Sequence, residues 1–360
     1  MRWSFTLAQI GATTVRLHLT FLLLVAWVGA IYWRSGGPAA ALDGVLFIIL
    51  VFLCVVLHEF GHVAAARRYG VRTPDITLYP FGGVASLERM PESPRQEIVV
   101  ALAGPLVNVA IAAVLLVLLG ARFDFRQVAE IQQAQMSLLG RLAAVNVILV
   151  LFNLIPAFPT DGGRVLRAAL SLRMDRVRAT RVAAYAGQAF AGLFVVLGLM
   201  GNPLLLLVGV FIFFAANAET EQVRQRAGAR GHVAADAAIR RFESLGPQST
   251  AEDASRLLLL TTQQEFPVVE SGGALLGMVT RRGLIEAMKQ GGDTAVSAFM
   301  DREVPVAEES EPLERVMDKV ARSPSRTVAL MDRGGRFTGY VSRENMVELF
   351  MVDDARRAAG

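Results

Sequence analysis

The chain of 360 residues is poor in cysteine and in charge. Its one cysteine, Cys54, excludes a scaffold that depends on disulfide bonds. Charged residues make up 19% of the sequence and hydrophobic residues 53%, against roughly 25% and 45–50% in an average soluble domain. This balance also excludes a disordered or collagen-like chain. We therefore expect segments that lie in a membrane.

The few charges are distributed unevenly along the chain. Residues 1–218 contain 17 basic and 10 acidic side chains, a net charge of +7, whereas residues 219–360 contain 19 and 22, a net charge of −3. We predict a membrane domain over residues 1–218, a linker at 219–235 and a water-soluble domain over residues 236–360. Because the soluble part is acidic, no nucleic-acid partner is expected.

Six apolar runs are long enough to cross a hydrocarbon core of about 30 Å, which takes about 20 helical residues. Ahead of the first run, residues 3–9 and 13–18 flank Gly11 and predict a short hairpin at the membrane surface. The expected fold class is a polytopic α-helical membrane protein with six transmembrane helices, followed by a soluble α+β module. The six runs are residues 17–33, 42–66, 96–119, 138–155, 182–200 and 203–218.

The positions of the basic residues predict the orientation, because cytoplasmic loops retain lysine and arginine. If the N-terminus is inside, the cytoplasmic segments contain 16 basic residues and the opposite loops contain 4. We therefore predict a multi-pass protein of the cell membrane, surrounded by the lipid bilayer, with both termini in the cytoplasm. The segments counted are 1–18, 67–95, 156–181 and 219–230 inside, and 34–41, 120–141 and 201–203 outside.

A metal-binding motif, His58-Glu59-Phe60-Gly61-His62, lies in the second apolar run. The two histidines are one helical turn apart on one face, so both imidazoles can reach a single metal ion. Glu59 is adjacent, where its carboxylate can take a proton from a metal-bound water. The competing interpretation is a chance match on a solvated helix. The host helix is strongly apolar, however, and ionisable groups in such a helix are costly and indicate function.

A catalytic zinc usually has three protein ligands and one open position, so a third ligand is needed. Asp161 is the candidate, in the segment Asn153-Leu-Ile-Pro-Ala-Phe-Pro-Thr-Asp161-Gly-Gly-Arg164 after the fourth apolar run. The prolines interrupt the helix, and the paired glycines allow backbone conformations that other residues resist. Non-helical backbone at membrane depth is tolerated where it lines a cavity. The alternative is an interfacial turn in which Asp161 only pairs with Arg164.

These two motifs resemble those of the site-2 proteases, a family of intramembrane zinc metalloproteases of the M50 type. The resemblance covers the whole membrane half of the chain. It implies that His58, His62 and Asp161 bind one zinc ion per chain and that Glu59 is the catalytic acid and base. It also implies that Asn153 helps to position the substrate or to stabilise the developing oxyanion.

Two further segments fit this resemblance less specifically. Gly82 and Gly83 lie in Tyr79-Pro-Phe-Gly-Gly-Val-Ala85, which is similar to a hairpin that the family places near the active site. An unwound substrate could pair there as an added strand; the alternative is a plain surface turn. Asn108 ends the segment Gly104-Pro-Leu-Val-Asn108, which is similar to a motif of the third core helix and implies a supporting role in substrate binding. Small residues in a crossing also serve helix packing.

The soluble half contains an internal repeat. Residues 266–288 align with residues 328–350 at an offset of 62, and the helical stretch 251–262 aligns with 313–324 at the same offset. Each copy predicts a strand, a glycine turn, a second strand and a helix. The repeats resemble a tandem pair of cystathionine-β-synthase-type (CBS) repeats, at about 236–292 and 293–352.

This second resemblance implies a module that packs with pseudo-twofold symmetry, that can associate copies of the chain into a homo-oligomer, and that often binds adenine nucleotides. The family pattern has a hydroxyl residue followed three positions later by an acidic residue. Here Thr280 is followed by Gly283 and Ser342 by Asn345, so neither copy has the carboxylate. Thr280, Ser342 and Asn345 are the candidate nucleotide contacts, and a purely structural role is the alternative.

Together these features predict a zinc-dependent endopeptidase that cuts a membrane-protein substrate in or near a transmembrane segment, as in regulated intramembrane proteolysis, with the CBS pair as a regulator. The alternative from another class is a membrane metal transporter or sensor gated by the CBS pair. Such a transporter is expected to place its ligands along a path, whereas these ligands converge on one site beside a general base.

Overall fold

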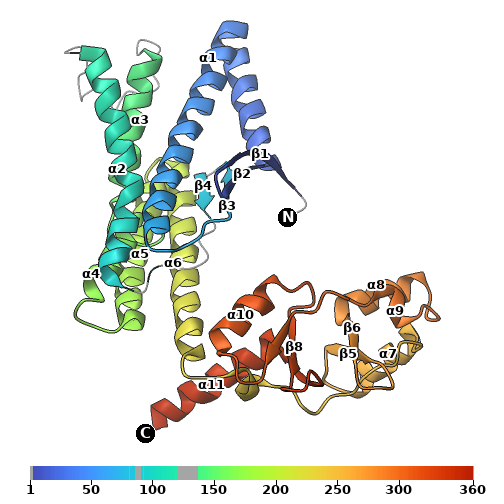
Figure 1. The fold of residues 1–360 in the computed structure, drawn as a ribbon. Coiled ribbons are helices and arrows are strands. Elements are labelled where there is room, and N and C mark those ends of the chain that lie inside the picture. The colour runs from blue at the N-terminus through green and yellow to red at the C-terminus, as the bar shows by residue number, and fades with distance from the viewer. Residues whose placement is uncertain (1–2, 81, 86–90, 92, 121–136, 360) are drawn as a thin grey trace. The chain divides into compact units, whose positions relative to one another are not determined.

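The computed structural model describes residues 3–80, 82–85, 91, 93–120 and 137–359 (Figure 1). The chain divides into two compact units, Met1–Glu221 and Gln222–Gly360. Each unit is described by itself below.

The first long helix, α1 (Leu19–Arg68), contains the second apolar run and all of the first except residues 17 and 18. Its backbone leaves helical geometry at Gly36 and Gly37, and Gly37 has a φ of 73°, which side chains other than glycine rarely adopt. Figure 1 shows that the helix turns back on itself there, so that two arms lie side by side. The rings of Phe21 and Phe52, one from each arm, meet edge to face with centroids 4.5 Å apart.

The prediction of six transmembrane helices is not confirmed, although the helical membrane region is. Among the described residues, four helices are long and apolar enough to cross a membrane: α1, α2 (Pro94–Leu119), α5 (Arg176–Leu199) and α6 (Pro203–Ala229). The run at 138–155 forms α3 (Leu138–Asn153), which is apolar but has only 16 residues. The count differs because α1 contains two of the predicted crossings and α3 is short.

Large apolar side chains point outward from these helices, as a hydrocarbon environment would favour. Val117, Leu199 and Phe214, from α2, α5 and α6, are all well exposed. Exposed large apolar side chains on several helices at once are unusual in a protein surrounded by water. Helix α6 also continues to Ala229, beyond the predicted end of the membrane domain at residue 218 and into the predicted linker.

A four-stranded sheet, in the order β1-β2-β3-β4, lies beside α1 (Figure 1). Strands β1 (Ser4–Ile10) and β2 (Thr13–His18) pair antiparallel, which confirms the predicted N-terminal hairpin. Strand β3 (Asp75–Tyr79) pairs parallel with β2 and antiparallel with β4 (Gly82–Ala85). In this order β4 is an edge strand.

The second unit repeats one pattern of elements at the predicted offset of 62 residues. The first copy has a helix, two antiparallel strands and a helix, and the second copy has the same four elements, so the predicted α+β repeat is confirmed. Each copy has its own cluster of buried apolar side chains. The first copy consists of α7 (Ala251–Leu260), β5 (Glu265–Val269), β6 (Leu275–Thr280) and α8 (Arg281–Gln290), and the second of α10 (Leu313–Arg322), β8 (Thr327–Met331), β9 (Phe337–Ser342) and α11 (Arg343–Ala359).

Three short elements complete this unit. They are η3 (Ala234–Ala237), α9 (Val296–Phe299) and β7 (Val306–Glu308), and β7 pairs parallel with β8.

Candidate metal centre

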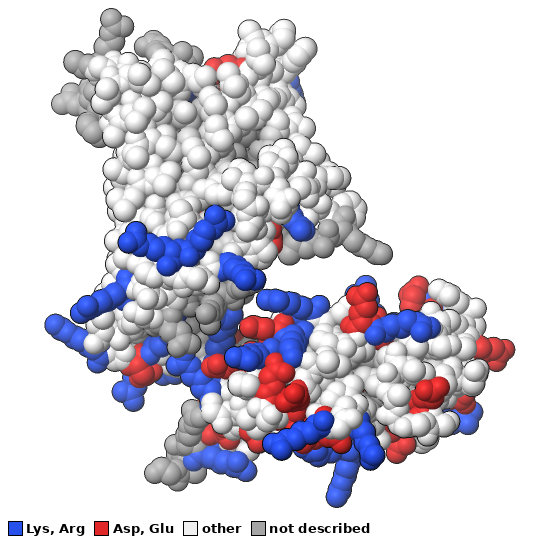
Figure 2. Space-filling model, in the orientation of Figure 1, with Lys and Arg blue, Asp and Glu red and all other residues white. Residues whose placement is uncertain are grey.

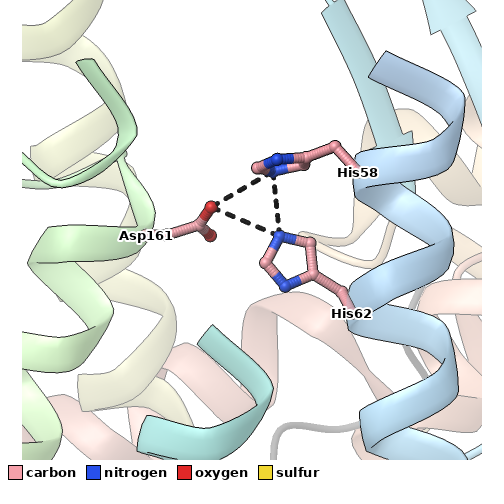
Figure 3. A group of neighbouring side chains, drawn as sticks. All are labelled: His58, His62 and Asp161. Atoms are coloured by element: carbon pink, nitrogen blue, oxygen red, sulfur yellow. Dashed lines mark hydrogen bonds and ion pairs between the residues drawn. The ribbon is translucent and has the colours of Figure 1, made fainter. Parts of the chain in front are cut away.

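Three buried side chains converge between α1 and the start of α4 (Asp161–Leu170) (Figure 3). The Nε2 atoms of His58 and His62 are 3.1 Å apart. One carboxylate oxygen of Asp161, Oδ2, is 3.3 Å from the first nitrogen and 3.2 Å from the second. The structure therefore brings together the three residues that the sequence suggested as metal ligands, although 99 residues separate His62 from Asp161.

Hydrogen bonds on the far side of each imidazole determine which ring nitrogen carries the proton. The Nδ1 of His62 lies 2.8 Å from the carbonyl oxygen of Val100, and the Nδ1 of His58 lies 2.5 Å from the carboxamide oxygen of Asn108. In this arrangement both partner atoms are oxygens that can only accept, so both Nδ1 atoms donate. In the neutral rings, each Nε2 atom then presents a lone pair to the other and to Asp161.

This donor set fits a zinc ion. In that neutral tautomer, two imidazole nitrogens and a carboxylate oxygen face one another with no proton between them, and a cation among them would relieve the repulsion. Zinc binds such ligands at about 2.0–2.2 Å in a tetrahedron, whose corners are then roughly 3.3 Å apart. The three observed separations, 3.1, 3.2 and 3.3 Å, agree with that spacing.

Glycine at position 104 leaves the space that the two imidazoles occupy. A methyl group on Gly104 of α2 would lie 2.3 Å from Nε2 of His62 and 2.7 Å from Nε2 of His58. The sequence analysis offered helix packing as the role of small residues in these crossings. Gly61 of α1 has that role, because a methyl group on it would lie 2.6 Å from the carbonyl oxygen of Ala103 in α2. Gly104 instead borders the metal-facing atoms themselves.

Glu59 lies between the two histidines in α1 and is half-buried. Strand β4 passes directly over it, because a methyl group on Gly83 would lie 2.8 Å from Cγ of Glu59 and 3.4 Å from its Oε1. Gly82, the first residue of the strand, has a φ of 139° and open space around it. Of the two predicted glycines, Gly83 therefore lies against the candidate base, and Gly82 begins the strand with a backbone conformation that favours glycine.

The backbone before α4 aims Asp161 at the histidines. The Thr160 hydroxyl caps this helix by accepting from the amide of Gly163 (3.4 Å), and it donates to the carbonyl oxygen of Ile155 (2.6 Å). A methyl group on Gly162 would lie 2.3 Å from that same carbonyl oxygen. The paired glycines therefore serve close approach of the preceding loop, and both residues are within the helix rather than in the unusual backbone conformation that the sequence suggested.

The alternative role for Asp161 was a turn in which its carboxylate pairs only with Arg164. That role explains the contact of one carboxylate oxygen but not that of the other. Oδ1 of Asp161 lies 3.8 Å from a guanidinium nitrogen of Arg164, while Oδ2 faces the histidines.

A buried charge cluster that the sequence analysis missed fixes the position of α4. The Arg167 side chain is 1% exposed and pairs with Glu97 of α2, which is equally buried, and with Glu219 of α6 (2.5 Å). Arg176, at the start of α5, contacts the other oxygen of Glu97 at 3.1 Å. The Arg167 guanidinium also lies 5.0 Å from the centroid of the Phe158 ring. The partners are 70 and 52 residues from Arg167, so no local pattern announces them.

The two remaining candidates of the membrane half differ in their placement. Asn108 is fully buried behind His58 and bonds to it and to Asn146. This position favours an orienting role toward the histidine over the predicted contact with substrate. Asn153 is the last residue of α3 and is half-buried, eight residues before Asp161.

Two of the three candidate nucleotide contacts of the CBS repeats, Thr280 and Ser342, cap helices. The Thr280 hydroxyl accepts from the amide of Gly283, and the Ser342 hydroxyl accepts from the amide of Asn345, each at 3.2 Å. Ser342 is 2% exposed, and the carboxamide of Asn345 donates to the carbonyl oxygen of Ala237 at 3.5 Å. These bonds favour the structural alternative, and adenine nucleotide binding stays a prediction.

Comparison with known proteins gives a match in each half of the chain. The model of peptidase family M50 matches residues 46–131 and 121–197. The model of the CBS domain matches residues 234–290 and 296–352.

Single relatives match over nearly the whole length. A zinc metalloprotease of Methanocaldococcus jannaschii is 32% identical over 360 residues, which cover 98% of this chain and 97% of that protein. A protein of Mycobacterium tuberculosis that carries a zinc metalloprotease name, Rip3, is 31% identical over 381 residues, covering 98% and 94%. Among solved structures, a site-2 protease from Methanocaldococcus jannaschii is 35% identical, covers 61% of this chain and 95% of its own, and superposes with a TM-score of 0.46.

Proposed function

Since this chain belongs to peptidase family M50, the site-2 proteases, and is a membrane zinc metalloprotease, we propose that it hydrolyses a peptide bond in or near a transmembrane segment of another membrane protein. The observation that carries the proposal is the convergence of His58, His62 and Asp161 beside Glu59, on helices with apolar outer surfaces. A site in that position meets substrates that are themselves in the membrane.

The four groups have distinct roles in the proposed reaction. His58, His62 and Asp161 would bind zinc, which supplies Lewis acidity toward the scissile carbonyl and toward water. Glu59 takes a proton from the attacking water while the oxygen of that water bonds to the carbonyl carbon. The same carboxyl group then gives that proton to the amine nitrogen as the carbon–nitrogen bond breaks. Asn153 is proposed to donate a hydrogen bond to the substrate.

Strand β4 is the proposed docking edge for the substrate. A helix conceals its carbonyl groups in its own hydrogen bonds, so the segment must unwind before attack. An extended segment can add to the free edge of a sheet through main-chain hydrogen bonds. Strand β4 is an edge strand whose Gly83 lies against Glu59, so a peptide paired with it would pass the candidate base.

We also propose the orientation and a route for regulation. Figure 2 shows that the charged side chains of the first unit gather toward one end of its helices on the visible face, and the excess of arginine in the segments of that side supports a multi-pass chain with cytoplasmic termini.

Helix α6 continues from the apolar region to Ala229, and its Glu219 pairs with Arg167 of α4, the helix that begins with Asp161. The CBS pair, which follows α6, is thereby connected to the ligand helix, and regulation by this route and association of copies through CBS pairs are part of the proposal.

The proposal is tested by comparing membranes that contain the wild-type protein with membranes that contain Glu59→Gln as the only copy. Glutamine keeps the size of the side chain but cannot accept the proton. We expect new peptide termini within transmembrane segments in the wild-type membranes, identified by mass spectrometry, and a decrease of about 100-fold or more in the variant. Both purified proteins should contain about one zinc per chain. Equal amounts of the same termini in both membranes would refute the role of Glu59 and the proposed reaction.

A further inference from the structure

Two asparagines, Asn108 of α2 and Asn146 of α3, are fully buried among apolar helices. Burying a carboxamide without partners costs several kcal/mol by transfer measurements, roughly 2–7 kcal/mol. These two amides have partners in one continuous chain of hydrogen bonds that ends at His58. The chain extends from α3 through α2 to the candidate ligand on α1.

The direction of this chain is determined at its far end. The carbonyl oxygen of Leu142 can only accept, so Asn146 must turn its NH2 group toward it, at 2.9 Å. The same NH2 group lies 3.4 Å from the sulfur of Cys54. Asn146 therefore presents its oxygen to Asn108, whose NH2 group donates to it at 2.8 Å. Asn108 is left with its oxygen toward Nδ1 of His58, at 2.5 Å.

The two histidines differ in how their protonation is controlled. His62 donates to a backbone carbonyl, that of Val100, which cannot present a donor in its place. His58 donates to a side-chain amide, which has an NH2 face as well as an oxygen face. If Asn108 were rotated by half a turn, its NH2 group would face Nδ1 of His58 and favour the tautomer whose Nε2 atom carries the proton. Such a ring cannot bind a metal through Nε2.

We propose that Asn146 is a positioning residue of the metal site, which orients Asn108 so that His58 presents a bare Nε2 atom. The inference rests on the proposed function, because it assumes that His58 binds the metal. The carboxamide of Asn146 bonds to Asn108, Cys54 and Leu142, so its effect on His58 passes through Asn108. Partners of this kind change metal affinity by about 10- to 100-fold.

A double-mutant cycle separates this role from a merely structural one. Asn146→Leu removes the oxygen that orients Asn108. Asn108→Asp makes the orientation of this side chain unimportant, because either oxygen of a carboxylate can accept from Nδ1 of His58. We expect Asn146→Leu to weaken zinc binding about 10- to 100-fold in the wild-type background and less than about 3-fold in the Asn108→Asp background. Zinc affinity of the full chain is measured by chelator competition, and the absorption spectrum of the cobalt-loaded protein reports the ligand arrangement.

Asn217→Leu is the matched control, because Asn217 also bonds across two helices, to Gln188 of α5 at 2.9 Å, but is exposed and outside the chain that ends at His58. It should leave zinc affinity and the cobalt spectrum unchanged. If Asn146→Leu does not fold, Asn146→Ser replaces it in the same cycle. Its hydroxyl can bond to the carbonyl oxygen four residues earlier, that of Leu142.

The outcomes distinguish this inference from the proposed function. An equal loss of affinity in both backgrounds, or none in the wild-type background, would overturn the role of Asn146 while the zinc site itself stands. A His58→Ala variant that binds zinc as tightly as the wild type would overturn the site, and with it the proposed function.

Discussion

Gly104 is the residue whose role depends most directly on its lack of a side chain. A methyl group at this position would lie 2.3 Å from Nε2 of His62, 2.6 Å from Cε1 of the same ring and 2.7 Å from Nε2 of His58. We predict that Gly104→Ala lowers zinc affinity by about 10- to 100-fold, since overpacking of a filled site typically costs about 1–3 kcal/mol. Chelator competition on the purified chain measures the change.

Gly192→Ala is the control for this substitution. Gly192 lies in α5, and a methyl group there meets no atom within 4 Å. Both variants add the same methyl group to an apolar helix, so a general effect of alanine on helix stability would appear in both. Unchanged zinc affinity in Gly104→Ala would show that the imidazoles can move away from position 104 at little cost.

At the scale of single residues, the sequence predicted the parts of the site that follow local rules. His58 and His62 are one helical turn apart, so their shared face follows from helix geometry alone. The segment around Asp161 made it a candidate, but only the family resemblance favoured it over simple pairing with Arg164, because nothing local relates Asp161 to α1. The orienting position of Asn108 was not predictable, since it depends on which side chain of α3 lies opposite.

At the scale of elements, the charge cluster around Arg167 shows what sequence patterns could not provide. Helix α4 has 10 residues and begins with a candidate ligand, so its placement determines the ligand geometry. Glu97, Glu219 and Arg176 connect it to three other helices through Arg167 and through one another. Leaving a buried charge without its partner is strongly destabilising, by about 3–5 kcal/mol. The pairing arises only when helices distant in sequence meet.

Element boundaries were predictable where a repeat supplied two copies of the same evidence. The offset of 62 residues holds for both strands and for the starts of both helices, since β5 begins at Glu265 and β8 at Thr327. The end of the last membrane-capable helix was not predictable in this way. Helix α6 continues past residue 218 because its later, polar residues are as compatible with a helix as its apolar ones.

Strand β5 of the CBS pair carries a titratable group with a testable effect. Burial, with Glu344 nearby, raises the pKa of the Glu265 carboxyl to about 7 from its ordinary 4.5. Between those two values the folded protein retains a proton that the unfolded chain has lost, so the free energy of unfolding decreases as the pH rises from about 4.5 to 7. Glutamine is neutral throughout. We predict that Glu265→Gln stabilises the module at pH 8 by about 1 kcal/mol and has little effect at pH 5.

Hydrogen exchange of the full chain measures this effect locally. Peptides that cover β5 and β6 are compared between variant and wild type at each pH, so the pH dependence of the intrinsic exchange rate cancels. We expect the variant to be more protected than the wild type at pH 8, and the two proteins to be nearly equally protected at pH 5. If variant and wild type were equally protected at pH 8 as well as at pH 5, the folded module would not hold the proton on Glu265 above pH 5.

At the scale of the whole molecule, the division into two units separates the metal site from the CBS pair. The candidate ligands, Glu59, Asn108 and Asn146 all lie within Met1–Glu221. So do Arg167 and its partners, of which Glu219 is the last in sequence. Each CBS repeat has its own buried cluster within the second unit. The residues that we assign to the metal site and to its support therefore end at Glu219 of α6, ahead of the repeats.

This division predicts the result of a truncation. A chain that ends at Ala229 retains α6 complete, and we expect it to bind about one zinc with an affinity within about 3-fold of the full chain, since the contacts described above for the ligands and for Arg167 are kept. Introducing Glu219→Gln into the shortened chain removes one carboxylate partner of a guanidinium that is 1% exposed. Its thermal midpoint should therefore fall, because a buried charge left partly unpaired is destabilising. Loss of zinc from the shortened chain with Glu219 intact would show that the CBS pair supports the metal site itself, and regulation would then act on metal binding and not on catalysis alone.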